Sequence, residues 1–137
     1  MTDAAITGAE ALLRVARAAG LRHVFGVAGG KLGPLLHAVS RDPALRYLGL
    51  RHEAAGPMMG AAIAAGGGGI AMALGEMGPG ALNLIAGAGG AAANHWPLLL
   101  VTTNQHRAAA YPHRGMFMDL DTRAVFAPLV KWSAVVG

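Results

Sequence analysis

The stretch IAMALGEMGPGALN, residues 70–83, decides the fold that we expect. Its first five residues are apolar without alternation, which is typical of a parallel strand that is covered on both faces. Gly78, Pro79 and Gly80 then give a turn signal, and a helix is expected to follow at 81–93. The stretch therefore predicts a buried strand that passes through a glycine turn into a helix.

The same alternation of strand and helix extends to both ends of the chain. Thr7 and Glu10 have the spacing of a helix capping box, and Gly20 supplies the stop signal of that helix. Further strands are expected at 23–27, 47–50, 98–102 and 131–136, and further helices through 32–39 and from about 53 to 65. We therefore expect an α/β fold of right-handed βαβ units, with an open, mostly parallel, doubly wound sheet and helices on both faces.

The composition is that of one compact domain. The 137 residues are 54% hydrophobic and 13% charged, and the net charge of +4 comes from basic residues scattered singly. Nucleic-acid binding normally requires a concentrated basic patch, so it is not expected. The chain has no cysteine, which excludes a disulfide scaffold and a thiolate metal site. Because the N-terminus lacks the pattern of a signal peptide, we expect a cytoplasmic protein.

The uncharged segment 54–75 is long enough to cross a membrane. It consists mostly of alanine and glycine, however, and contains Pro57 and the glycine run 66–69. It lacks the leucine, isoleucine and phenylalanine density of a membrane helix. A buried helix, a glycine turn and a buried strand fit the segment better, so no membrane role is expected.

The residues that follow the predicted strands should share one edge of the sheet, where ligands of open α/β sheets collect. These loops are 28–30, 51–53, 76–80 and 104–106. Two of them are glycine turns that let the backbone approach a ligand closely. One carries Glu53 in the first turn of a predicted helix, and one carries side-chain amides. The residues alone therefore predict a binding site at this edge.

Three other patterns are given simpler interpretations. The segment 87–92 matches a dinucleotide-binding fingerprint but lies inside a helix, where its glycines would permit close helix packing. Lys31 follows two glycines without the Ser or Thr of a phosphate-binding loop, so it is interpreted as a solvated lysine. The six histidines show no zinc-ligand spacing, and no metal site is expected in this chain. His106 and His113 are interpreted as surface histidines, with a substrate-handling role left open.

Three motifs together resemble the pyrimidine-binding domain of the acetolactate synthase family. They are VAGG at 27–30, RHE at 51–53 and GPGALN at 78–83, in this order and spacing. The later segments 115–121 and 128–132 also resemble the part of that domain before its last strand. The resemblance covers nearly the whole chain and implies that residues 1–137 are a single thiamine-diphosphate pyrimidine-binding domain.

The resemblance implies that Glu53 is the catalytic carboxylate. In the family this Glu hydrogen-bonds a ring nitrogen of the aminopyrimidine and stabilises its imino tautomer. A partly desolvated carboxyl group suits this task because it can share a proton with a weakly basic nitrogen near neutrality. Without the flanking motifs, the simpler interpretation would be that Glu53 complements a helix dipole.

The resemblance also implies a set of cofactor-binding residues besides Glu53: Gly29, Gly30, Gly78, Pro79, Asn83 and Gln105. Asn83 would brace the glycine loop, and Gln105 would lie close to the cofactor or the substrate. Each turn taken alone is explained equally well as an ordinary strand-to-helix turn.

The chain departs from the family at Ala28, where a proline is usual, at Leu82, where a small hydroxyl residue is usual, and at Glu76-Met77, which replace a hydroxyl pair. These changes blur the identity of the substrate. The Gly-Asp-Gly motif that holds magnesium and the diphosphate in the family is not found in this sequence. We therefore expect a fragment that lacks its last helix, a middle domain that holds flavin (FAD) in the synthases, and the diphosphate-binding domain.

The expected function is thiamine diphosphate binding and activation within a 2-oxo acid carboligase or decarboxylase, a transferase or lyase. The expected partners are a 2-oxo acid substrate and the diphosphate-binding domain with its Mg²⁺, in cis or on another subunit of a homodimer or homotetramer. Two alternatives stay open. One is a catalytically inactive binding or regulatory module of the same fold, and the other is an unrelated nucleotide-binding α/β domain.

Overall fold

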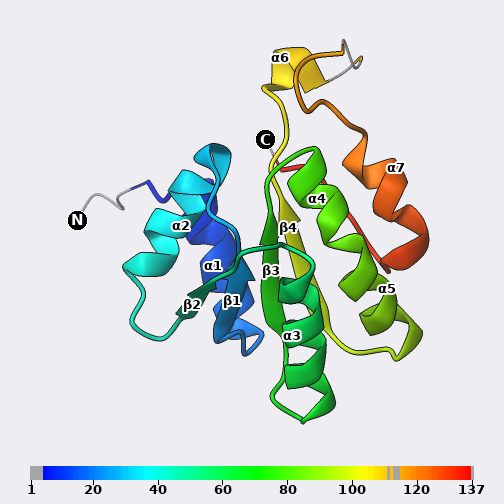
Figure 1. Cartoon of the computed structure of the whole chain (residues 1–137). Helices are drawn as coiled ribbons and strands as arrows, with labels where there is room; N and C mark the ends of the chain where they lie inside the picture. The colour runs from blue at the N-terminus through cyan, green and yellow to red at the C-terminus, as the bar shows by residue number, and fades with distance from the viewer. Residues whose placement is uncertain (1–4, 111, 113–114, 137) are drawn as a thin grey trace.

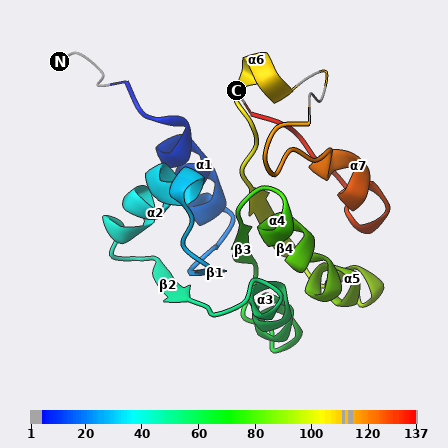
Figure 2. The same ribbon diagram turned by 45° about the horizontal axis from the view of Figure 1, so that its top comes forward.

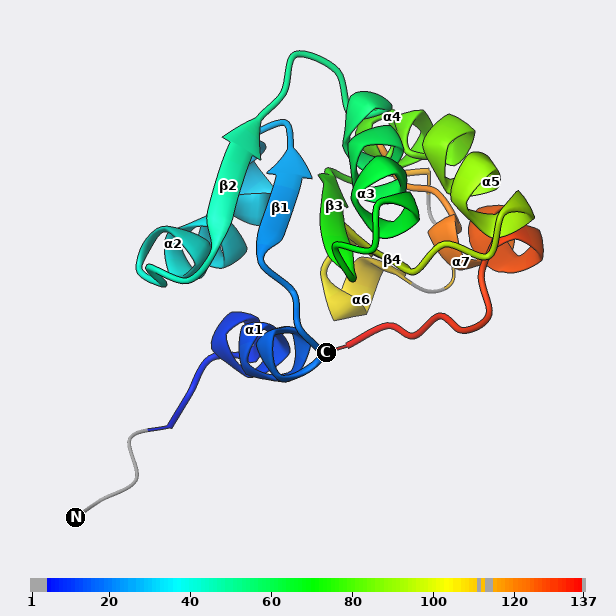
Figure 3. The ribbon, with the colours of Figure 1, turned by 90° about the horizontal axis from the view of Figure 1, so that it is seen from below.

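The sheet has four parallel strands within the part of the chain that the structure, a computed structural model, describes: residues 5–110, 112 and 115–136. The strands are β1 (His23–Gly26), β2 (Arg46–Gly49), β3 (Ala71–Gly75) and β4 (Leu98–Thr102). Their order in the sheet is β2-β1-β3-β4, as Figure 3 shows from below. Val24 of β1 pairs with both Tyr47 of β2 and Met72 of β3. The expected open parallel α/β sheet is confirmed.

Helices cover both faces of this sheet (Figure 1). In chain order, the helices of the described residues are α1 (Gly8–Ala18), α2 (Gly33–Ser40), α3 (Ala55–Ala65), α4 (Pro79–Asn83), α5 (Ile85–Ala93), α6 (Arg107–Ala110) and α7 (Thr122–Phe126), with short 3-10 turns η1 (Gly30–Leu32) and η2 (Ala127–Leu129). Of these, α6 lies beyond the carboxyl end of β4 rather than on a face of the sheet (Figure 1). None of the helices within the described residues combines the length and the apolarity needed to cross a bilayer.

The two helical layers meet the sheet on alternate side chains of β3. Met72 and Leu74 belong to the core cluster that includes Leu13 of α1 and Leu35 of α2. Ala73 belongs to the opposite cluster with Leu84, Ala88 and Phe126. All five residues of β3 are buried, because each face of a doubly wound sheet is covered by helices. This double cover explains why the sequence of the strand does not alternate.

The N-terminal helix begins as its sequence predicts. The Thr7 hydroxyl oxygen accepts the Glu10 N–H at 3.2 Å, and the Glu10 carboxylate accepts the Thr7 N–H at 2.7 Å. These reciprocal bonds form the capping box. Gly20, the expected stop, has a φ of +91°, a conformation that L side chains rarely adopt.

The expected helix 81–93 consists of two helices, α4 and α5. Pro79 is the first residue of α4, a position where its fixed φ and missing N–H are tolerated. The Leu84 N–H bonds to the carbonyl oxygens of Ala81 and Leu82, so the regular ladder is interrupted there. Leu84 itself is fully buried in the core. The helical pattern of the sequence is therefore correct, but its continuity is not.

The prediction of a fifth strand at 131–136 is wrong. The segment runs without regular structure along the molecule (Figure 1). No backbone hydrogen bond among the described residues joins it to β4, and Trp132 and Val136 are 77% and 88% exposed. A strand needs both ladder hydrogen bonds and a covered face, and this apolar segment has neither. The structure also forms α6 and α7 where the sequence predicts only an irregular segment.

Glycines let α3 and α5 pack closely on the same face of the sheet. A Cβ atom added at Gly87 would lie 2.6 Å from the Pro57 ring and 2.7 Å from the Met58 backbone nitrogen. The same addition at Gly90, one turn further along α5, would meet nothing within 4 Å. The interpretation of the glycines in 87–92 as packing residues is therefore confirmed for Gly87 and does not extend to Gly90.

Substitutions at these two glycines should change stability in opposite directions. Gly87→Ala forces the helices apart and should lower the free energy of unfolding by about 1–3 kcal/mol. Gly90→Ala removes the entropic cost of a glycine in a helix and should raise the free energy of unfolding by about 0.5–1 kcal/mol. Urea unfolding of both variants measures the difference, and equal changes would contradict the packing role of Gly87.

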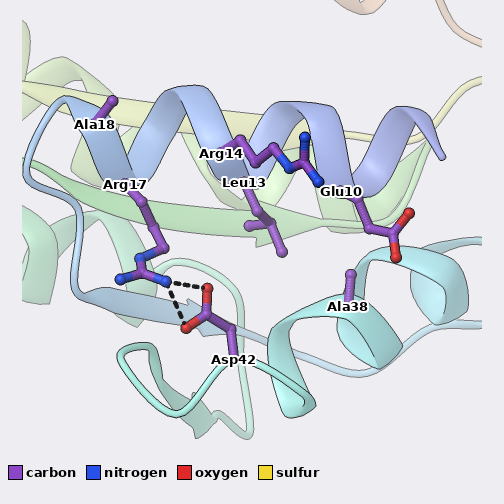
Figure 4. Close-up of a pocket in the computed structure, with 7 residues that line it drawn as sticks. All are labelled: Glu10, Leu13, Arg14, Arg17, Ala18, Ala38 and Asp42. Atoms are coloured by element: carbon purple, nitrogen blue, oxygen red, sulfur yellow. Dashed lines mark hydrogen bonds and ion pairs between the residues drawn. The ribbon is translucent and has the colours of Figure 1, made fainter. Parts of the chain in front are cut away.

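A groove of about 560 Å³ lies between α1 and α2 (Figure 4). Arg17 donates to both carboxylate oxygens of Asp42 there, at 2.8 and 2.9 Å. The pKa of Asp42 lies below its ordinary value, chiefly because the Ala44 N–H bonds to the carboxylate and secondly because of Arg17. The pKa of Glu10 is lowered mainly by the Thr7 N–H.

These two carboxylates predict a loss of stability in acid. A carboxyl group with a lowered folded-state pKa stabilises the fold above its unfolded pKa, and this contribution is lost as the pH falls through the lowered value. The loss should therefore occur below pH 4.5 for Glu10 and below pH 3.8 for Asp42. Urea midpoints measured from about pH 6 to about pH 3 should fall less in Glu10→Gln, which keeps a capping acceptor, than in the unaltered protein. Parallel curves would contradict the prediction.

Candidate functional site

The strand order places a topological switch point at the carboxyl edge of the sheet, between β1 and β3. The chain leaves β1 toward β2 on one side and returns to β3 on the other, and α1 and α2 cover one face while α3 to α5 cover the other. Ligands of open α/β sheets bind at such a switch point. The loops after β1 and β3 flank it, at the edge that Figure 2 brings forward. Neither the groove between α1 and α2 nor the smaller hollow beside it contains any of the predicted site residues.

Glu53 lies at this edge, in the turn between β2 and α3, and is half-buried. Its carboxylate oxygen Oε2 accepts a hydrogen bond from Asn83 Nδ2 of α4 at 2.9 Å. We expected α3 to begin near Glu53, but it begins at Ala55, and its first turn contains no acidic residue. Glu53 therefore does not lie in the first turn of α3, where it would complement the helix dipole. Its side chain instead bonds to Asn83 of α4, across the edge of the sheet.

Gly80 lets the second oxygen of Glu53 approach the backbone of α4. A Cβ atom added at Gly80 would lie 3.1 Å from Glu53 Oε1 and 3.6 Å from Glu76 Cβ. Gly80 thus leaves room for the side chains of both Glu53 and Glu76 beside α4. Asn83, expected to brace the glycine loop, makes its side-chain hydrogen bond to Glu53 instead.

The glycine loop after β3 also has structural reasons for its sequence. Gly78 has a φ of +69°, and a Cβ atom there would lie 2.8 Å from Met118 Cβ. Met118 belongs to the segment 115–121 and has a φ of +62° itself. Pro79 is exposed at the start of α4. A non-glycine residue at 78 would therefore meet both an unfavourable φ and a covered position.

The loop after β1 is fixed by Glu76. Glu76 Oε1 accepts the Lys31 N–H at 2.7 Å. A Cβ atom added at Gly29 would overlap the Glu76 carboxylate and lie 2.6 Å from its Cδ, whereas one added at Gly30 would meet nothing within 4 Å. The two glycines look alike in the sequence, but only Gly29 makes room for another residue of the site.

Gln105 connects three segments of the edge. Its Oε1 accepts a hydrogen bond from Lys31 Nζ at 2.9 Å, and its Nε2 donates to the Phe117 carbonyl oxygen at 2.9 Å. Lys31 Nζ also lies 3.5 Å from the carbonyl oxygen of Asn104. Gln105 is therefore at the expected edge, with both ends of its amide bonded to protein.

Lys31 is the site residue that the sequence interpretation missed. Its side chain is exposed, as expected of a solvated lysine, but both its backbone and its ammonium group are bonded within the edge. Its place directly after the glycine turn that follows β1 is the sequence signal that could have identified it. His106 is exposed at the edge, and His113 lies outside the described residues.

The contact between Gly29 and Glu76 predicts non-additive substitutions. Gly29→Ala should push the Glu76 carboxylate off the Lys31 N–H and lower the free energy of unfolding by about 1 kcal/mol. In a Glu76→Ala background the same substitution should cost less, because the obstructing carboxylate is gone and only the Cβ atom of residue 76, 3.1 Å away, remains. Gly30→Ala is the matched control and should be close to neutral in both backgrounds. A double-mutant cycle by urea unfolding measures the coupling, and full additivity would refute it.

Comparison with known proteins agrees with this arrangement. Residues 6–125 match the family described as "Thiamine pyrophosphate enzyme, N-terminal TPP binding domain". The chain is 32% identical over 134 residues to the acetolactate synthase large subunit of Parasynechococcus marenigrum (strain WH8102), which covers 96% of this chain and 21% of that protein. It is 35% identical over 128 residues to the 2-hydroxyacyl-CoA lyase of Oryza sativa subsp. japonica, covering 92% of this chain and 21% of the lyase.

A third relative is the 2-hydroxyacyl-CoA lyase 2 of Danio rerio, 32% identical over 129 residues, with 94% of this chain and 20% of the lyase covered. The chain thus spans about a fifth of the length of these relatives. The resemblance to the acetolactate synthase family is confirmed. With its parallel sheet and with the family's motifs at the carboxyl edge, the chain belongs to the N-terminal TPP-binding domains of the thiamine pyrophosphate enzymes.

Proposed function

We propose that the edge between β1 and β3 binds the aminopyrimidine of thiamine diphosphate and that Glu53 is the catalytic carboxylate. The observation that carries the proposal is the environment of Glu53. One of its oxygens is held by Asn83, and the other lies against Gly80, in a turn at the ligand-binding edge of the sheet. A ring nitrogen of the ligand needs a group that can accept or donate a proton, and that group must have an oxygen free to reach it. The Glu53 carboxyl group has such an oxygen.

The residues present fit the cofactor. Asn83 restricts the Glu53 carboxylate to one orientation, and Gly80 leaves backbone without a side chain beside it that a planar ring can approach, whereas Gly78 is covered by Met118. When bound, thiamine diphosphate supplies the nucleophilic carbon that attacks a 2-oxo acid carbonyl. Glu53 would hold or release a proton at its free oxygen, and Pro79 would wall the ring. Gln105, with its amide already bonded to Lys31 and Phe117, would hold the wall together.

We further propose that the diphosphate and Mg²⁺ are held by another domain, in cis or on another subunit of a homo-oligomer. In support, no group of three or more histidine, cysteine, aspartate or glutamate side chains in the described part of the chain could hold a metal ion. Of the two carboxylates at this edge, Glu76 is bonded to the Lys31 N–H and Glu53 is bonded to Asn83. The one free oxygen of Glu53 suits a heterocycle better than a dication, which needs several oxygen ligands. In this proposal, an enzyme of this kind that holds flavin binds it in a further domain.

The proposed activity is that of a 2-oxo acid carboligase or decarboxylase. It is supported by the relatives named acetolactate synthase and by the intact Arg51-His52-Glu53 segment at the edge of the sheet. A catalytically inactive binding module would have no need of a half-buried carboxylate held on one oxygen, and the substitution below separates the two functions.

Glu53→Gln should abolish turnover without unfolding the chain. The amide oxygen of Gln can still accept from Asn83, but the side chain can no longer ionise, so turnover of pyruvate by the complete enzyme should fall by about 10²–10⁴-fold. Thermal unfolding and cofactor binding should change little. Glu10→Gln is the matched control, since it makes the same charge change on α1 outside the site. Unchanged turnover in Glu53→Gln would remove Glu53 from its role and favour a regulatory module.

A further inference from the structure

A short loop brings both contacts of the Glu53 carboxylate into place. Three residues, 76–78, connect the end of β3 to the start of α4. Gly80 and Asn83 of α4 then approach the two oxygens of Glu53. Figure 1 shows α4 leaving the carboxyl end of β3 next to β4. The contacts to Glu53 therefore depend on how this loop is held.

Each of the three residues of this loop is held by a different segment. Glu76 bonds to the backbone that follows β1, and Gly78 packs against the segment 115–121. Between them, the Met77 N–H donates to the side-chain oxygen Oγ1 of Thr103 at 3.0 Å. Thr103 directly follows β4, so this bond ties the loop to the neighbouring strand of the sheet.

The Met77 N–H depends on Thr103. Among the described residues, Oγ1 of Thr103 is the one acceptor found for this N–H. The Met77 side chain is 3% exposed, so the residue cannot turn toward water without exposing it. An N–H that loses its acceptor away from water costs more than the hydrogen bond itself contributed. We therefore expect the loop to shift when the Thr103 oxygen is removed.

The first turn of α4 packs directly on the end of β3. A Cβ atom added at Gly75 would overlap the Gly80 carbonyl oxygen and lie 3.0 Å from Cδ1 of Leu84. Leu84 is itself fully buried. Close-packed groups transmit a displacement instead of absorbing it. A shift of the loop at Met77 therefore moves the start of α4, which carries the contacts to Glu53.

We propose that Thr103 is a positioning residue for the Glu53 carboxylate. It acts through the Met77 N–H and the first turn of α4, not by contact with a ligand. This inference rests on the proposed function of Glu53. Without the Thr103 oxygen, α4 shifts and the hydrogen bond from Asn83 to Glu53 weakens. The carboxylate is then no longer held in one orientation, which slows a reaction that requires a fixed geometry.

The direct test follows the side-chain amide of Asn83 by NMR in the ¹⁵N-labelled 137-residue chain. Asn83→Ala assigns the signal, and Glu53→Ala gives its position without the hydrogen bond. Thr103→Val keeps the branched shape of the side chain and removes the acceptor, so it should move the Asn83 signal toward the position found in Glu53→Ala. An Asn83 signal that stays in place in folded Thr103→Val would overturn the proposal.

Two further variants control this measurement. Thr103→Ser keeps the hydroxyl oxygen and should restore the Asn83 signal. Thr102→Val makes the same substitution at the preceding residue, the last of β4, and should leave the signal unchanged. If Thr103→Val does not fold, Thr103→Ala removes the same oxygen without adding a methyl group, and its Asn83 signal is read in the same way.

The kinetic test uses the complete enzyme with pyruvate. Thr103→Val should lower kcat about tenfold and leave KM within about twofold, while Thr103→Ser and Thr102→Val should keep kcat. In a Glu53→Gln background, Thr103→Val should lower turnover no further, because no carboxylate is left to position. Losses that multiply in the double variant would indicate a merely structural role and refute the inference. Unchanged turnover in Glu53→Gln alone would instead refute the proposed function.

Discussion

The structure depends on the burial of β3 between two strands and two layers of helices. Its side chains alternate between the core cluster that includes α1 and α2 and the cluster that includes α5 and α7, so each of these clusters contains residues of β3. The strand also pairs with both β1 and β4, which makes its carboxyl end the meeting point of the loops that carry the site. One apolar segment thus fixes both the stability of the domain and the location of its chemistry.

The site that results contains two carboxylates with different surroundings. Glu53 is held by a neutral amide and has an oxygen directed at glycine backbone, whereas Glu76 is bonded to the backbone of Lys31 and closely covered by Gly29. The first arrangement leaves a group that can exchange a proton with a ligand. The second uses the carboxylate to fix a loop. A side chain at position 80 would crowd the Glu53 carboxylate and the Cβ atom of Glu76, which the glycine avoids.

The parts of the fold that the sequence predicts correctly have local signals. The capping box of Thr7 and Glu10 and the apolar run of β3 can each be recognised within a few residues. The segment 131–136 has the composition of a strand, but composition does not say whether the segment pairs with the edge strand of the sheet. In the described part of the structure it does not pair, and Trp132 is exposed. Lys31 is exposed, as predicted, but its hydrogen bonds could not be predicted, because its partners come from loops far along the chain and no local spacing reports them.

The close contact between Gly29 and Glu76 has a consequence for how such a site can change in evolution. A side chain at position 29 displaces the carboxylate of Glu76, so the effect of a substitution at either position depends on the residue at the other. A lineage that first shortens residue 76 can add a side chain at position 29 at a lower cost, whereas one that keeps Glu76 loses its hydrogen bond to the Lys31 N–H when it does so. The glutamate therefore acts as a historical constraint on the neighbouring loop, and these two positions should vary together among descendants of this sequence.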